Sequence, residues 1–282
     1  MSASFGERLQ RAHDTYGPLC VGIDPHEHLL AEWGMDATAA ATRDFGLRVI
    51  EAAAGRVGVV KPQVAFFERY GAAGFAALED VLRAGREAGL LVIADAKRGD
   101  IGSTMDGYAG AWLEPGAPLE ADALTVTPYV GVEALEGTLH QAIRAGKGVF
   151  VLAATSNPEA RELQRADVAD DTVAALVVDQ VTAFNAATTH EDRWGSIGVV
   201  IGATVDLVAA GLGLHTEDPV APILAPGFGA QGAQPRDLRV RFGSRAGAVL
   251  ASESRSILSA GPGGLAARID ERSAQYREAT DD

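Results

Sequence analysis

Short apolar segments alternate along the whole chain with alanine-rich segments of helical period. The apolar segments lie at 19–24, 57–61, 90–95, 123–127, 148–153, 197–202, 222–225 and 248–252. Between them, the segments at 37–54, 74–88, 132–145, 171–189 and 205–214 repeat apolar positions every three or four residues, as a helix packed on one side does. The pattern predicts eight strands separated mainly by helices.

Repetition of strand and helix indicates a parallel sheet, because a parallel connection needs a crossover that is long enough to hold a helix. The strands are almost continuously apolar, which is typical of strands buried on both faces. Eight such units in 282 residues fit a closed (β/α)8 barrel, the TIM-barrel type of α/β fold, better than an open sheet. Because no low-complexity linker interrupts the units, we expect residues 1–282 to form a single domain.

Charge and cysteine content narrow the classes of function. With 24 basic and 38 acidic residues the net charge is −14, which argues against binding to nucleic acid or to an anionic membrane. The N-terminus lacks the order of a signal peptide, and glycines and Asp206 interrupt the longest apolar stretch, at 196–215. Cys20 is the single cysteine, which excludes an internal disulfide and favours the cytoplasm.

Charged residues gather where the predicted strands end. Asp24 and Lys61 end the first two strands, and the third delivers Asp95 and Lys97, with Asp100 just past its turn. In a barrel these ends meet at one mouth, where active sites are built. Asp95 and Lys97 share a face, and Asp100 could close on the same ammonium group. Because carboxylates favour the charged form of a lysine, the sequence predicts that Lys97 donates a proton rather than acting as a nucleophile.

The last two strands are followed by loops suited to an anion. Gly227, Gly229 and Gly232 follow the seventh strand, and Arg255 follows the eighth. Barrels commonly bind phosphate with these two loops through backbone N–H groups, and an arginine adds a charge-assisted contact. The same glycines fit a dinucleotide fingerprint with Glu253 as its ribose-binding acid. That fingerprint should open a long helix in the first unit of a domain, so the phosphate site is favoured.

Other chemistries have partial support. His26 and His28 form a His-x-His after the first strand, but the later ligands of a metal site are missing, so we interpret both as loop residues. A Schiff-base enzyme needs a neutral lysine, a state that the acidic neighbours of Lys97 oppose, although Lys61 is less constrained. A barrel that binds a nucleotide without catalysis remains a further alternative. No cofactor motif is present, and we expect neither a cofactor nor a metal.

The charged motif also carries a family resemblance. The sequence Asp-Ala-Lys-Arg-Gly-Asp-Ile-Gly-Ser-Thr at 95–104 is preceded by Asp24 and Lys61 and followed by Pro-Gly-x-Gly-Ala-Gln-Gly and Arg-Ser-Ile. Together these closely resemble orotidine 5'-phosphate decarboxylase, in its longer bacterial subgroup often called type 2, from the first strand to the eighth. Related sugar-phosphate decarboxylases share Asp-x-Lys-x-x-Asp but carry an acidic residue where this chain has Lys61. The resemblance implies cofactor-free conversion of orotidine 5'-phosphate to uridine 5'-phosphate (UMP) in pyrimidine biosynthesis.

The resemblance further implies roles for individual residues. Lys97 would protonate C6 of the substrate within a charged network completed by Lys61, Asp95 and Asp100. Substrate contacts would come from Asp24 and Lys61 to the ribose hydroxyls, Ser156 or its neighbour Thr155 to the pyrimidine, and Gln231 and Arg255 to the phosphate. Asp100, Ile101 and Thr104 would reach the site of a second subunit, which implies a homodimer with shared active sites. One departure is Ser254, where many relatives have glycine before the arginine.

Overall fold

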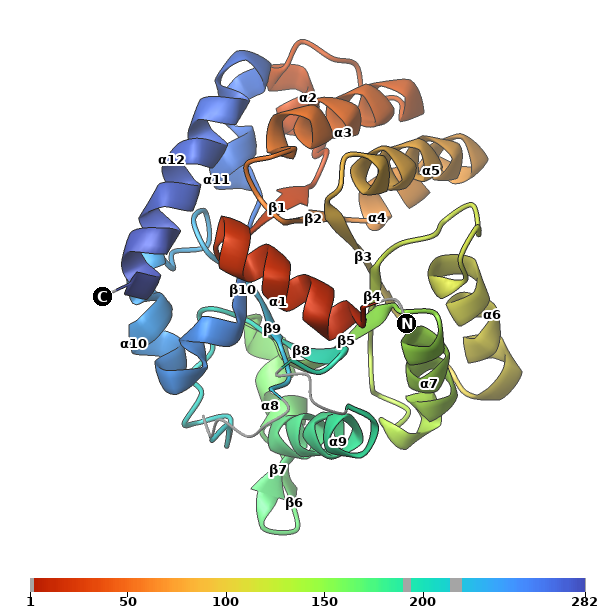
Figure 1. Cartoon of the computed structure of the whole chain (residues 1–282), viewed down its shortest axis with the longest axis vertical. Helices are drawn as coiled ribbons and strands as arrows, with labels where there is room; N and C mark the ends of the chain where they lie inside the picture. Colours follow the sequence, from red (N-terminus) through yellow and green to blue (C-terminus); the bar gives the residue numbers. More distant parts are fainter. Residues whose placement is uncertain (1–2, 190–193, 214–219, 282) are drawn as a thin grey trace.

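A computed structural model describes residues 3–189, 194–213 and 220–281. Eight parallel strands close into a barrel in the order β1-β10-β9-β8-β5-β4-β3-β2, so the predicted (β/α)8 fold is confirmed (Figure 1). The barrel strands are β1 (Leu19–Ile23), β2 (Val59–Pro62), β3 (Leu91–Arg98), β4 (Ala123–Val126), β5 (Gly148–Ala154), β8 (Ile197–Ile201), β9 (Ile223–Pro226) and β10 (Val249–Glu253). A separate antiparallel pair, β6 (Asp167–Val168) and β7 (Asp171–Thr172), follows β5.

Helices surround the barrel and connect its strands (Figure 1). The α-helices are α1 (Phe5–Tyr16), α2 (Glu27–Glu32), α3 (Ala39–Ala53), α4 (Ala65–Glu68), α5 (Gly71–Glu87), α6 (Gly102–Leu113), α7 (Glu136–Arg144), α8 (Arg161–Gln164), α9 (Val173–Thr188), α10 (Leu238–Phe242), α11 (Arg255–Leu258) and α12 (Gly261–Asp281). Short 3-10 helices are η1 (Glu133–Leu135), η2 (Pro158–Ala160), η3 (Pro235–Asp237) and η4 (Gly243–Ala248).

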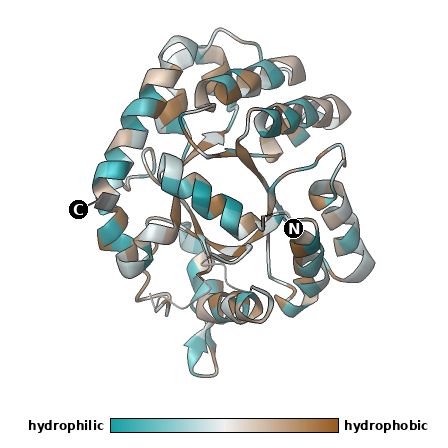
Figure 2. Cartoon of the chain, viewed as in Figure 1, coloured by the Kyte–Doolittle hydropathy of each residue, from teal (hydrophilic) through white to brown (hydrophobic). Residues whose placement is uncertain are grey.

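The core has two parts, one on each face of the barrel wall. Strand residues that point outward, such as Val21 and Val92, pack against the helices in the larger cluster. Residues of the opposite parity, such as Cys20 and Ile93, form a second cluster inside the barrel. Figure 2 shows the strands coloured mainly as hydrophobic, whereas the outer helices carry hydrophilic residues. Burial of both strand faces explains why the strand segments are apolar without interruption.

Helix α1 closes one end of the barrel (Figure 1). Its Phe5 and Leu9 are fully buried in the inner cluster, and the ring of Phe5 meets that of Phe150 edge to face at 6.2 Å between centroids. Arg8 forms an ion pair with Asp122, which precedes β4, at 2.8 Å. The sequence pattern did not predict this helix. It fills the end at which the strands begin, and a cavity lined by residues at the C-terminal strand ends lies at the other end.

Several predicted segments differ from the structure. The helix predicted at 205–214 does not form over its described residues, which follow a series of turns that reaches the left-handed conformation at Gly211 (φ 69°); residue 214 lies outside the described part. His28 lies within α2 and His26 at its N-terminus, so neither is a simple loop residue. Helices α6 and α12 were not predicted. Across the described residues, no helix has the length and hydropathy needed to cross a bilayer.

Candidate active site

Strand parity places polar groups at the mouth of the barrel. Inside the barrel, three strands each carry an apolar residue followed two positions later by a polar one. These pairs are Val59 and Lys61 on β2, Ile93 and Asp95 on β3, and Ala123 and Thr125 on β4. The apolar members fill the inner cluster, and the polar members lie nearer the C-terminal strand ends. One alternation therefore builds both the floor and the charged site.

A cavity of about 260 Å³ opens at this mouth. The predicted site residues that line it are Asp24, Lys61, Asp95, Lys97, Thr155, Ser156, Gly227, Gln231 and Arg255. The remaining predicted residues, Asp100, Ile101, Thr104, Gly229 and Gly232, do not line this cavity in the single chain. Thr125, Gln63 and Ser254 line it as well but were not predicted as site residues.

The centre of the cavity is a carboxylate held between two lysines. Asp95 Oδ1 lies 2.5 Å from Lys97 Nζ, and Asp95 Oδ2 lies 2.8 Å from Lys61 Nζ. Asp95 is 8% exposed and Lys61 5%. Burial disfavours both charges, but the lysines outweigh it and hold the pKa of Asp95 well below its usual value. Likewise, the charges of Asp95 and Asp24 overcome burial and raise the pKa of Lys61.

This electrostatic state distinguishes between the alternative chemistries. A Schiff-base mechanism needs a neutral amine, whereas Lys61 is stabilised in its charged form. The carboxylates of Asp95 and Asp24, which raise the pKa of Lys61, therefore count against Lys61 as a nucleophile. A permanently charged Lys61 is instead typical of a site that stabilises negative charge developing during a reaction.

The backbone at Lys97 is unusual. Its φ is 49°, in the left-handed region that a residue with a side chain rarely adopts, and the pairing of β3 with β4 shifts register between Ala94 and Arg98. Thr125 supports this conformation, because its Oγ1 accepts a hydrogen bond from the Lys97 N–H at 3.0 Å and donates one to Asp95 Oδ1 at 3.0 Å. The sequence signal for Thr125 was a polar residue inside an apolar strand. A left-handed backbone at a residue such as Lys97 costs about 1–3 kcal/mol and is often found at functional sites.

Asp24 and Asp100 are the other two acidic residues that were predicted for the site. Asp24 Oδ1 is buried and has no hydrogen-bond partner among the described residues, an arrangement suited to receiving a ligand hydroxyl. Asp100 Oδ1 accepts a hydrogen bond from the Ile101 N–H at 2.8 Å. None of the ion pairs in the described chain joins Asp100 to Lys97. The expectation that Asp100 closes on the Lys97 ammonium is therefore not met within one chain, where its carboxylate is directed to its own loop.

The glycine loop after β9 has a shaped backbone. Gly227, Gly229 and Gly232 have φ of 117°, 70° and 109°, which favour glycine. The N–H groups of Gly229 and Gly232 bond to carbonyls within the loop, to Ala233 at 2.7 Å and Gly229 at 3.0 Å. These two glycines therefore shape the loop, while Gly227, Gln231 and Arg255 face the cavity.

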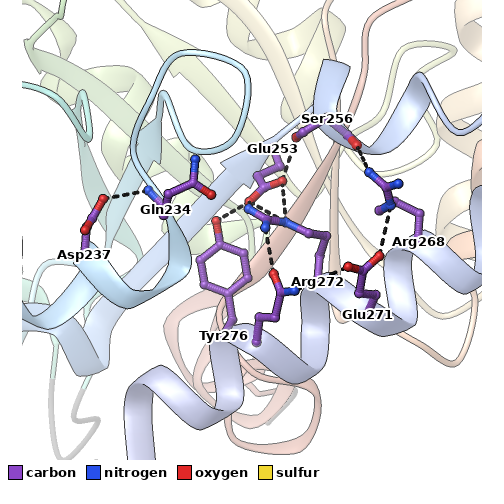
Figure 3. A network of polar contacts seen from close by, with 9 residues as sticks. Gln234, Asp237, Glu253, Ser256, Arg268, Glu271, Arg272 and Tyr276 are labelled. Atoms are coloured by element: carbon purple, nitrogen blue, oxygen red, sulfur yellow. Dashed lines mark hydrogen bonds and ion pairs between the residues drawn. The ribbon is translucent and has the colours of Figure 1, made fainter.

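A buried polar network around Glu253 packs against the glycine loop (Figure 3). Glu253, at the end of β10, binds Arg272 and Tyr276 of α12 and accepts a hydrogen bond from Ser256 Oγ at 2.6 Å. A Cβ added to Gly229 would lie 2.2 Å from Ser256 Oγ, so the network contacts the glycine loop directly. Burial and the Glu253 charge raise the pKa of Tyr276. Because its carboxylate is fully engaged here, Glu253 is not available as a ribose-binding acid, and the dinucleotide alternative is wrong.

Histidine and cysteine groups lie apart from this chemistry. The rings of His26 and His28 are 5.2 Å apart between centroids, yet the described chain places no three His, Cys, Asp or Glu side chains together in a metal-binding arrangement. Cys20 lies in the barrel interior, where burial raises the pKa of its thiol to about 12. The thiol is therefore neutral at physiological pH.

Fold and site together define a (β/α)8-barrel enzyme with a lysine and carboxylate centre beside the loops that follow β9 and β10. The chain belongs to the orotidine 5'-phosphate decarboxylase / HUMPS family, whose model matches residues 17–268. It is 51% identical over 266 residues to the orotidine 5'-phosphate decarboxylase of Salinispora tropica, covering 94% of this chain and 93% of the relative. The predicted family and enzyme class are thereby confirmed.

Solved structures agree with this assignment. A Streptomyces avermitilis chain described as a candidate orotidine 5'-phosphate decarboxylase superposes with a TM-score of 0.93 at 46% identity, covering 100% of this chain and 97% of that one. The Leishmania donovani OMP decarboxylase superposes with a TM-score of 0.80 at 30% identity, covering 99% of both chains. The likeness therefore extends over the whole barrel.

The low folded pKa of Asp95 predicts how stability depends on pH. On acidification the unfolded chain binds the proton first, so the stabilisation by this carboxylate is complete above about pH 4 and is lost as the pH falls toward the folded pKa. The free energy of unfolding of the wild-type protein minus that of Asp95→Asn should be constant from about pH 5 to 7 and decrease below about pH 4. Urea unfolding at each pH measures it. In a Lys61→Met background the decrease should be smaller, and a difference that grew on acidification would contradict the prediction.

Proposed function

We propose that this protein converts orotidine 5'-phosphate to UMP and carbon dioxide in pyrimidine biosynthesis, without a cofactor. The observation that carries the proposal is Asp95 held between Lys61 and Lys97 at the mouth of the barrel. The family match and the names of the relatives support the substrate. Phosphate-type loops beside the charged centre fit a nucleoside monophosphate.

The proposed reaction uses Lys97 as the proton donor. The bond between C6 and the carboxylate breaks, carbon dioxide leaves, and the electron pair remains on C6. An ammonium group beside C6 stabilises this developing negative charge and then transfers its proton to the carbon. The Lys97 side chain is 46% exposed, so it can regain a proton from water.

The other cavity residues would bind and orient the substrate. Asp95 holds the Lys97 ammonium in place and would lie beside the departing carboxylate. In the proposed arrangement, Asp24 and Lys61 bind the ribose hydroxyls, Ser156 binds the pyrimidine, and Gln231, Arg255 and the Gly227 loop bind the phosphate. Binding energy from the distant phosphate would then order the site around the reacting carbon.

We further propose a homodimer with shared active sites. The loops after β3 and β4 expose Ile101 (60%), Tyr129 (81%) and Val130 (43%), large apolar side chains that are usually covered. Asp100 lies in the same β3 loop and Thr104 in the first turn of α6, and neither lines the cavity of its own chain. A two-fold partner would both cover these apolar groups and receive Asp100 in its site.

Two broader proposals concern the whole chain. We propose that it folds as a single domain, since strands from both ends of the sequence, β1 and β10, pair side by side in the barrel; a single cooperative unfolding transition would support this, and two separable transitions would contradict it. We also propose a cytoplasmic location, which the lone buried Cys20 supports. Recovery of the protein in another cell fraction would contradict that location.

Replacing Lys97 tests the proposed chemistry. The absorbance change of orotidine 5'-phosphate should show turnover by the wild-type protein that a chelator does not alter. In Lys97→Ala turnover should fall by about a thousandfold or more, because both the charge and the proton are lost. Lys97→Arg keeps the charge but holds its proton too tightly, so it should also be strongly impaired. UMP affinity should change by less than about tenfold in either variant.

Near-normal turnover by Lys97→Ala would remove Lys97 from the mechanism. If the wild-type protein bound UMP but did not turn over the substrate, the non-catalytic nucleotide-binding alternative would be favoured. Sensitivity to a chelator would instead point to a metal-dependent enzyme.

Replacing Arg255 tests the phosphate site. In Arg255→Ala the KM for orotidine 5'-phosphate and the Kd for UMP should rise about 10- to 100-fold, because a charge-assisted contact to phosphate is lost. Uridine, which lacks the phosphate, should bind the variant as it binds the wild-type protein. Arg241→Ala is a matched control, since Arg241 does not line the cavity. Unchanged UMP affinity in Arg255→Ala would place the phosphate on another cation.

Mixing two inactive variants tests the shared site. Lys97→Ala and Asp100→Ala should each be inactive alone. In a mixed dimer with shared sites, one site combines Lys97 of one subunit with Asp100 of the other and is intact. Random exchange of subunits should therefore restore about a quarter of wild-type activity. Sedimentation should show a dimer. A monomer, or no recovery after confirmed exchange, would contradict the proposal.

A further inference from the structure

The segment at 158–172, which lies between the loop after β5 and helix α9, has no part in the chemistry described so far. It contains η2 (Pro158–Ala160), α8 (Arg161–Gln164) and the small pair of β6 and β7. Its far end is fixed, because Thr172 Oγ1 donates a hydrogen bond to the Ala210 carbonyl at 2.7 Å and the Val173 N–H donates to the Ala166 carbonyl at 3.0 Å. The segment is thus a folded structure placed beside the mouth of the barrel.

Gln164, at the end of α8, connects this segment to the loop that follows β5. Its Oε1 accepts a hydrogen bond from the backbone N–H of Thr155 at 2.8 Å. Its Nε2 donates to Thr155 Oγ1 at 3.0 Å. The Thr155 hydroxyl in turn donates to Asn157 Oδ1 at 2.7 Å. One amide side chain therefore binds both the backbone and the hydroxyl of the first loop residue after β5.

These contacts distinguish the two hydroxyls of the loop. Thr155 Oγ1 is engaged on both sides, as donor and as acceptor. Ser156 lines the cavity and has no side-chain hydrogen bond among the described residues. On its other side the loop packs against Gly202, the residue that follows β8, where an added Cβ would lie 3.2 Å from the Ser156 backbone nitrogen. Ser156 thus sits between a packed strand end and the residue that Gln164 holds.

The loop has few other supports. Ser156, Asn157, Pro158 and Glu159 are all exposed. A short exposed loop that must present one hydroxyl to a ligand loses conformational entropy on binding unless it is already ordered. The two contacts from Gln164 supply that order before the ligand arrives.

We propose that Gln164 is a positioning residue for recognition of the pyrimidine. It fixes Thr155 so that Ser156 alone presents its hydroxyl to the base, and it acts on the ligand only through this loop. The inference rests on the proposed function, because Ser156 is the residue proposed to bind the pyrimidine. It assigns a role to the segment at 158–172 that differs from those of Lys97 and of the phosphate loops.

The test compares a ligand that has a base with one that lacks it. Gln164→Ala should bind UMP about tenfold more weakly than the wild-type protein, as expected for loss of a preorganised hydrogen bond. Ribose 5-phosphate, which keeps the sugar and phosphate but has no base, should bind both proteins within about twofold. Titration calorimetry or competition against turnover measures both affinities. A general structural defect would weaken both ligands together.

A double-mutant cycle shows whether the effect passes through Ser156. Ser156→Ala should weaken UMP binding to a similar extent, and adding Gln164→Ala to it should cause no further loss. Gln164→Glu keeps the acceptor for the Thr155 N–H and should retain part of the affinity. Leu163→Ala is the matched control, since this exposed neighbour lies on the same short helix, and it should bind UMP normally.

Three results would overturn the inference: unchanged UMP affinity in Gln164→Ala, equal weakening of both ligands, or fully additive losses in the double variant. Should Gln164→Ala fail to fold by circular dichroism, Gln164→Glu carries the same comparison. Failure of the proposed function is recognised separately, because then the wild-type protein in the same preparation does not convert orotidine 5'-phosphate.

Discussion

The buried carboxylate of Asp95 and its two lysines form the interaction on which the site depends. Removing charged groups from water is costly, and the cost is offset only when opposite charges and hydrogen bonds replace the lost solvent. Here Lys61, Lys97 and Thr125 all contact the one carboxylate. Asp24 lines the same cavity, so two carboxylates and two lysines face one another there. In the proposed reaction, the Lys97 ammonium held in this cluster would face the negative charge that develops on the substrate.

The barrel makes this cluster possible by holding its members on separate, rigid strands. Lys61, Asp95 and Thr125 come from β2, β3 and β4, each two positions beyond an apolar residue in the interior. Closure of the opposite end by α1 keeps that interior packed. The irregular step in β3 then turns the Lys97 backbone into a left-handed conformation, so that its ammonium returns to the carboxylate of Asp95 on the same strand.

Support for the binding loops comes from elements outside the barrel. Arg272 and Tyr276 of helix α12 bind Glu253 (Figure 3). Glu253 in turn accepts a hydrogen bond from Ser256, which packs against the glycine loop. Two strands away from β9 in the barrel, Gln164 of α8 binds the loop after β5. Arg272 and Tyr276 lie about 20 residues along the chain from Glu253. Gln164 lies nine residues beyond Thr155, the loop residue that it binds. A mutation in either region would act on the site without touching its ligand.

The eight strands, the mouth at which their charges meet and the Asp-x-Lys-x-x-Asp motif could all be predicted from the sequence, because periodicity and strand-end positions are local properties of the chain. The pattern did not predict α1, and it predicted a helix at 205–214, of which the described residues 205–213 form turns. It also offered Glu253 as a ligand, whereas Glu253 is buried and bound to Arg272 and Tyr276. Thr125 and Gln164 were also not predicted as site residues. Their partners are fixed by which strands become neighbours and by how a loop folds back. Those contacts are set by the tertiary fold, because hydrogen bonds between neighbouring strands and across a folded loop depend on distances that no local pattern encodes.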